Sequence, residues 1–168
     1  MGSLSKKPYE ERNDDEKLLS NWHKAVGLFE REDWSASILR VATSSEIASN
    51  IYIRHYLLQK HHLPADFVDA LLKSANGMAG KFRQLITPAA KSLGNWEQIK
   101  SIQKKIDSIN KHRNEVAHEG KFKNKPDAEL VFSYAIEVIG LLAPNVKEEA
   151  ARKAEFSNFK HRREKKNI

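Results

Sequence analysis

The chain has 168 residues, of which 40% are hydrophobic and 30% charged, a size and balance typical of one globular domain. It contains no cysteine, which excludes disulfides, thiolate nucleophiles and thiolate metal ligands. The formal net charge of +7 favours anionic partners such as nucleic acid. No apolar run approaches the ~20 residues that cross a bilayer, and the polar start of the chain does not resemble a secretory signal. We therefore expect a cytoplasmic protein with no membrane association.

The sequence of the N-terminal third of the chain predicts a disordered segment followed by two helices. Residues 1–12 are polar and are expected to be disordered. Asn13 can cap a first helix, whose apolar residues recur at helical spacing as far as Phe29. A second helix is predicted from Ser35 to about Lys60. Its apolar residues cover most of its circumference, which is typical of a central or interface helix.

The middle of the chain is broken by turn residues. Pro64 is predicted to open a short third helix, and a further helical piece should stop near Pro88. The stretch "SLGN" predicts a turn. From Asn95, a plausible cap, a long helix is expected to run to about Glu119, with Gly120 in the left-handed conformation that ends helices.

Two more helices are expected after this point. Pro126 or Asp127 should open an apolar helix that stops at Pro144, and a basic helix is predicted over residues 146–162. No strand-like alternation is present. The predicted fold is therefore all-α: an up-and-down bundle of four to five main helices over 13–145, with a short helical insertion between the second and third long helices. Residues 146–168 are predicted to form a basic C-terminal helix and tail.

The long helix from Asn95 contains an anomaly. Its apolar positions step by three and four, and the next position on the same face is Arg113. Burying a guanidinium is unfavourable unless an anion answers it. Glu46 interrupts an apolar face of the second helix in the same way, so we predict that Glu46 faces Arg113 across the core. This pair could be catalytic or purely structural. The apolar positions before Arg113 are Ile99, Ile102, Ile106 and Ile109.

Two more polar residues follow Arg113 closely. Asn114 and His118 are four apart, so they share one helix face. Arg113 lies about 140° around the helix axis from His118. The two can meet if the long arginine side chain reaches round, or if a second copy of the helix packs against the first. His118 is in the last turn, where the helix dipole favours a positive imidazole, and it could donate a proton near neutral pH or simply complement the dipole.

The hexamer "RNEVAH", residues 113–118, resembles the Arg-Asn-x-x-x-His signature of the HEPN superfamily (higher eukaryotes and prokaryotes nucleotide-binding). The resemblance extends over roughly residues 14–143: the motif ends a long helix in a small helical bundle, and an acidic residue stands on an earlier helix. It implies a metal-independent endoribonuclease of the kind found in prokaryotic defence and toxin–antitoxin systems. Such proteins are usually homodimers with the motifs of both chains at a shared cleft, and an antitoxin or other protein is a possible further partner.

The resemblance also implies roles for individual residues. Arg113 would bind the scissile phosphate and His118 would transfer protons. Asn114 would have an orienting role, and Glu46 would position Arg113. The 2′-OH of the RNA would be the nucleophile, giving a cyclic phosphate, and no metal or cofactor is expected. Some family toxins carry a tyrosine two residues beyond the histidine, where an antitoxin modifies them; Gly120 stands there in this chain. Residues predicted to contact RNA around the motif are Lys111, His112, Lys121 and Lys123.

Three other functions are compatible with the sequence. A non-catalytic HEPN-like module would bind nucleotide, RNA or a protein partner without cleavage. A structural bundle would use the charged pair for packing alone. A helix-turn-helix DNA binder fits less well, because the candidate stretch contains Pro88 and its second helix is poor in side chains that read bases.

Overall fold

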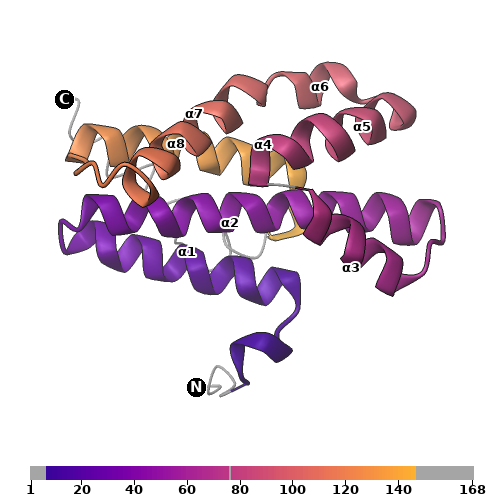
Figure 1. The fold of residues 1–168 in the computed structure, drawn as a ribbon, viewed down its shortest axis with the longest axis horizontal. Coiled ribbons are helices and arrows are strands. Elements are labelled where there is room, and N and C mark those ends of the chain that lie inside the picture. Colours follow the sequence, from indigo (N-terminus) through magenta and orange to yellow (C-terminus); the bar gives the residue numbers. More distant parts are fainter. Residues whose placement is uncertain (1–6, 76, 147–168) are drawn as a thin grey trace.

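The computed structural model describes residues 7–75 and 77–146, which form an assembly of helices (Figure 1). No strand occurs in these two ranges, so the predicted all-α class is confirmed. Within the same ranges, no helix combines the length and the apolar character needed to cross a membrane. The predicted basic helix over residues 146–162 lies, beyond Val146, outside the described residues.

The first helix, α1 (Asp14–Glu30), begins where the capping signal predicts. The Asn13 side chain accepts a hydrogen bond from the Glu16 N–H, and the Glu16 carboxylate accepts one from the Asn13 N–H. This reciprocal pair satisfies two backbone groups that helix starts otherwise leave without partners. Before it, a short 3₁₀ helix η1 (Tyr9–Glu11) occupies part of the segment predicted to be disordered, so regular structure starts before residue 13.

The second helix, α2 (Trp34–Arg54), is the central element and continues as a π-helix, η2 (His55–Lys60). It packs against α1, α7 and α8, and none of the large apolar residues that the described structure exposes lies on it. Its apolar circumference is therefore covered within one chain. The apolar residues around α2 are therefore explained by its central position in the bundle. They no longer indicate a dimer interface on α2.

The predicted insertion is present as α3 (Ala65–Ser74), α4 (Gly77–Lys81), a π-helix η3 (Phe82–Ile86) and α5 (Thr87–Leu93). The expectation that helix stops near Pro88 is wrong, because the helical path continues through it to Leu93. The N–H of Thr87 bonds five residues back, to the Phe82 carbonyl. This wider π turn accommodates the residue that has no N–H of its own. Gly94 then ends α5 in the left-handed conformation.

The predicted long helix is two helices, α6 (Trp96–Lys100) and α7 (Gln103–Ala117). Between them, the N–H groups of Ser101 and Ile102 bond three residues back instead of four, which tightens the chain into a 3₁₀ turn. All four isoleucines of the predicted apolar face are nevertheless buried. The break therefore changes the direction of the chain without exposing that face.

The last described long helix, α8 (Lys125–Leu142), is capped by Asn124 through a reciprocal pair with Asp127. It lies against α2 and α7 and supplies the middle of the core. There the Phe132 ring meets the Trp22 and Phe29 rings edge-on, with centroids 5.3 and 5.2 Å apart. The bundle therefore consists of α1, α2, α7 and α8, with α3–α6 inserted between the second and third of its long parts.

Candidate functional site

The structure brings Arg113, Asn114 and His118 together at the end of α7. Arg113 Nη1 donates to Asn114 Oδ1 at 3.0 Å and lies 3.3 Å from His118 Nε2. The arginine side chain reaches round the helix, which was one of the two routes that the sequence allowed. A second copy of the helix is therefore not required for the guanidinium and the imidazole to meet. We call these three residues the Arg–Asn–His cluster.

The contact between the Arg113 and His118 side chains has a simple chemistry. A guanidinium only donates, so a hydrogen bond between the two groups requires the His118 tautomer in which Nε2 accepts. The imidazole then presents a lone pair next to a fixed positive charge. This combination can take a proton from a hydroxyl while the guanidinium holds an anion.

Local backbone structure explains why the cluster forms at this place. His118 is the residue that caps α7, and its N–H bonds the Asn114 carbonyl at 2.9 Å. Gly120 follows with a φ of +61°, a left-handed conformation that strains residues with a β-carbon. The same conformation disfavours a tyrosine at this position, so the glycine is explained by the turn.

The cluster is exposed, contrary to the prediction that Arg113 is buried. Arg113 and His118 are exposed and Asn114 is half-buried. The Lys123 N–H bonds Ser35 Oγ at 2.9 Å, which places the loop that follows α7 beside the start of α2 (Figure 1). Ile109 is the last buried residue of the apolar face, and one turn further the helix has reached the end of the bundle. Arg113 therefore meets solvent.

The predicted contact between Glu46 and Arg113 is wrong. Glu46 Oε1 accepts from the Lys81 ammonium of α4 at 2.7 Å, and the Lys81 side chain is 8% exposed. Helices α2 and α7 are neighbours, as predicted, but Glu46 lies eleven residues beyond Ser35, about 16 Å further along α2. The carboxylate therefore neutralises a cation in the insertion and does not position Arg113.

Two of the four lysine and histidine residues predicted to contact RNA are held by carboxylates. Lys123 is 8% exposed and forms an ion pair with Glu115. Lys121 is exposed, but its ammonium lies 2.8 Å from Glu119 and 3.9 Å from Glu115. The Lys123 hydrogen bond holds the pKa of Glu115 below its usual value, and the Glu119 hydrogen bond raises the pKa of Lys121. Lys123 therefore supports the loop and is not available to a ligand in this arrangement.

The other two, Lys111 and His112, differ from each other. Lys111 is exposed on α7. His112 is half-buried, and its Nδ1 is buried without a hydrogen-bond partner. Burial lowers the pKa of His112, and the positive charge of Lys123 lowers it further, while Asp127 and Glu115 oppose the change. His112 therefore favours the neutral form, whereas Lys111 presents an exposed positive charge.

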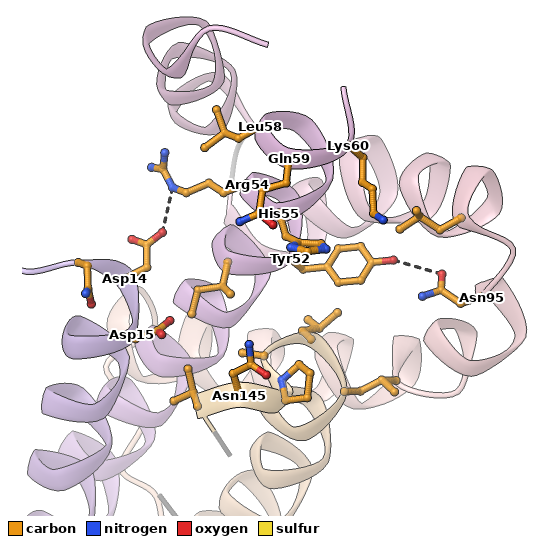
Figure 2. A pocket seen from close by; sticks show the side chains of 18 residues that line it. Asp14, Asp15, Tyr52, Arg54, His55, Leu58, Gln59, Lys60, Asn95 and Asn145 are labelled. Carbon is orange, nitrogen blue, oxygen red and sulfur yellow. Dashed lines mark hydrogen bonds and ion pairs between the residues drawn. The ribbon is translucent and has the colours of Figure 1, made fainter. Parts of the chain in front are cut away.

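A cavity of about 830 Å³ lies at the other end of α2 (Figure 2). Two of its charged groups, Arg54 and Asp14, are paired with each other. Arg54 Nε lies 2.9 Å from Asp14 Oδ2 and the same guanidinium also pairs with Asp69. The Tyr52 hydroxyl donates to Asn95 Oδ1 at 3.2 Å, and burial raises the pKa of Tyr52. No member of the Arg–Asn–His cluster lines this cavity, so the exposed cluster remains the candidate site.

Comparisons with family models, curated proteins and solved structures found no match to this chain. The candidate site therefore rests on its own chemistry. Three residues of the described structure, Lys81 in the insertion and Glu115 and Phe122 near the site, were not singled out from the sequence for their contacts or exposure. Lys81 had a signal, because it falls on the apolar face of its helix with Met78 and Phe82. No such signal in the sequence marked Glu115, which forms ion pairs with two lysines, or Phe122, which is 97% exposed.

Proposed function

We propose that this protein is a metal-independent endoribonuclease of the HEPN type. The observation that carries the proposal is the 3.3 Å approach of Arg113 Nη1 to His118 Nε2 on an exposed surface. RNA cleavage by internal transesterification needs a base for the 2′-OH and a positive charge for the phosphorane. The cluster offers both groups 3.3 Å apart. The prokaryotic defence or toxin–antitoxin setting rests on the resemblance of residues 113–118 alone.

The proposed reaction uses these groups in order. His118 Nε2 takes the proton of the 2′-OH as the 2′ oxygen bonds to phosphorus and the bond from phosphorus to the 5′ oxygen breaks. The Arg113 guanidinium offsets the charge that develops on the non-bridging oxygens. Asn114, hydrogen-bonded to Arg113, keeps the guanidinium on the side of the imidazole. A proton from a second imidazole or from water completes the 5′-hydroxyl product, and the other product carries a 2′,3′-cyclic phosphate.

A homodimer is part of the proposal. In one chain the cluster is open to solvent, so a strand would meet it on one side only. A second copy related by twofold symmetry would supply the facing wall and the second imidazole. The exposed end of α7 is the surface available for such an arrangement, with the strand between the two copies.

The test is incubation of the purified full-length protein with total RNA in the presence of EDTA. We expect cleavage by the unaltered protein. His118→Ala and Arg113→Ala should each reduce the rate about 100-fold or more. Both variants should keep the melting temperature within about 2 °C, since exposed side chains away from structural features contribute little to stability. Arg83→Ala, which removes an exposed cation from η3, is the matched control and should retain activity. Full activity of both cluster variants would contradict the proposal.

A non-catalytic RNA-binding module is the second candidate. It is favoured by the way the cluster side chains satisfy one another at the C-terminal end of α7, where positive groups complement the helix dipole. In this case the unaltered protein would retain RNA in a filter-binding assay, and the RNA would be recovered intact. Arg113→Ala would then weaken binding, whereas His118→Ala would change it little.

A further inference from the structure

The loop between α7 and α8 carries an apolar ring with an unusual exposure. Phe122 is 97% exposed, whereas the next most exposed large apolar residue of the described structure, Phe67, is 56% exposed. Phe122 therefore contributes almost nothing to the core. A side chain that packs against nothing in the chain is free to contact a ligand.

The position of Phe122 is fixed by its neighbours on both sides. The Lys121 N–H bonds the Glu115 carbonyl at 3.0 Å, and the Lys123 N–H bonds Ser35 Oγ at 2.9 Å. The side chains of Lys121 and Lys123 both turn back to the Glu115 carboxylate. Because both neighbouring side chains are held against the protein, the ring between them is left exposed. The exposure of Phe122 thus follows from a loop that is tied down, and little ordering is needed for binding.

The surroundings of Phe122 suit a nucleic acid. Its Cα can lie at most about 14 Å from that of His118, because only four residues separate them. Residues 111–125 carry five Lys and Arg against two Glu, a net charge of +3 with histidine neutral. A twofold contact made through Phe122 would bring two such positive segments together. An aromatic ring among cations instead matches a base attached to a phosphate strand.

We propose that Phe122 stacks against an unpaired base of the RNA, next to the phosphate that Arg113 holds. This inference rests on the proposed function, because it assigns the substrate class of the same site. A base inside a duplex is already stacked on its neighbours, so a protein ring selects single-stranded RNA. Stacking reads no base edge and tolerates any sequence. Phe122 is thus a specificity-determining residue for single strands over duplexes.

The test measures binding separately from cleavage. In a His118→Ala background, Kd is measured by fluorescence anisotropy for a short, unstructured, labelled oligouridine and for an abasic ribose-phosphate oligomer of the same length. Phe122→Ala should weaken oligouridine binding about 5- to 150-fold, while Phe122→Trp should retain it. The abasic oligomer should bind both proteins equally. Phe67→Ala, on α3, is the control for loss of an exposed ring and should bind as the parent does.

Three results would overturn the inference. The first is an unchanged oligouridine Kd for Phe122→Ala. The second is an equal loss for the abasic oligomer, which would assign the ring to folding. The third is conversion of a dimer to a monomer on sedimentation, which would assign the ring to a protein interface. The proposed nuclease function and the stacking inference can fail independently of each other. If the unaltered protein binds oligouridine through Phe122 but cleaves no RNA, the stacking site stands and the nuclease does not. If the unaltered protein cleaves RNA and Phe122→Ala leaves the oligouridine Kd unchanged, the nuclease stands and the stacking site does not.

Discussion

Replacing Glu46 by alanine tests the placement of the one predicted site residue that the structure moves elsewhere. The Lys81 ammonium lies 2.7 Å from the Glu46 carboxylate, and the Lys81 side chain is 8% exposed. After the substitution, the nearly buried Lys81 ammonium loses the carboxylate with which it pairs. Both residues line a polar cleft of about 510 Å³ between α2 and the insertion, so some water can enter.

The magnitude follows from these exposures. Removing one partner of a fully buried ion pair costs about 3–5 kcal/mol. The Glu46 side chain is 38% exposed, so solvent already screens the pair and the cost is reduced. We expect a loss of about 1–3 kcal/mol, the cost of an unsatisfied buried polar group. At about 3 °C per kcal/mol for a domain of this size, the melting temperature should fall by about 3–9 °C.

Urea unfolding followed by far-UV circular dichroism measures this loss. Lys81→Met should be close to neutral alone, because an apolar side chain of similar length suits the site. Combined with Glu46→Ala it should recover most of the lost stability. RNA cleavage per folded molecule should be unchanged in Glu46→Ala. Unaltered stability together with lost cleavage would refute the reasoning and return Glu46 to the side of Arg113.

Three further predictions concern the core and the loop. Phe132→Ala should lower the free energy of unfolding by about 3–5 kcal/mol in a urea titration, because it empties the centre of an aromatic cluster; a loss below about 1 kcal/mol would contradict that packing. Since the pKa of His112 is lowered in the folded state, the unfolded chain takes up a proton at this residue first as pH falls. The stability of the protein should therefore decline from about pH 6.5 downward. Calorimetry at several pH values measures this decline, and His112→Asn should make it shallower. Glu115→Gln should speed hydrogen exchange at the amides of Lys121 and Lys123, and unchanged exchange would show that Glu115 does not hold the loop.

The elements of the fold were largely predictable because their signals are local. Asn13 caps α1 and Gly94 ends α5, as turn and capping chemistry indicated. The break after Lys100 carries no glycine or proline, so nothing in the sequence marked it. Pro88 gave a false stop, because the π turn before it depends on how the insertion packs and not on the proline alone.

The site was predictable only where its residues are close in sequence. Arg113, Asn114 and His118 lie within six residues, and the length of the arginine side chain decides that they meet. The partner of Glu46 depends on the register of α2 against helices that are distant in sequence, and a single sequence does not specify that register. The position of Lys81 on an apolar face indicated that it is buried but did not identify its partner.

The most direct test of the central claim is the chemistry of the cut. A single-stranded RNA and an oligomer of the same sequence with 2′-deoxyribose throughout are incubated with the protein in EDTA, and the product ends are analysed by mass spectrometry. The account predicts that the RNA alone is cleaved, leaving a 2′,3′-cyclic phosphate and a 5′-hydroxyl, and that His118→Ala leaves it intact. Cleavage of the deoxy oligomer, or of RNA by His118→Ala at the unaltered rate, would contradict it.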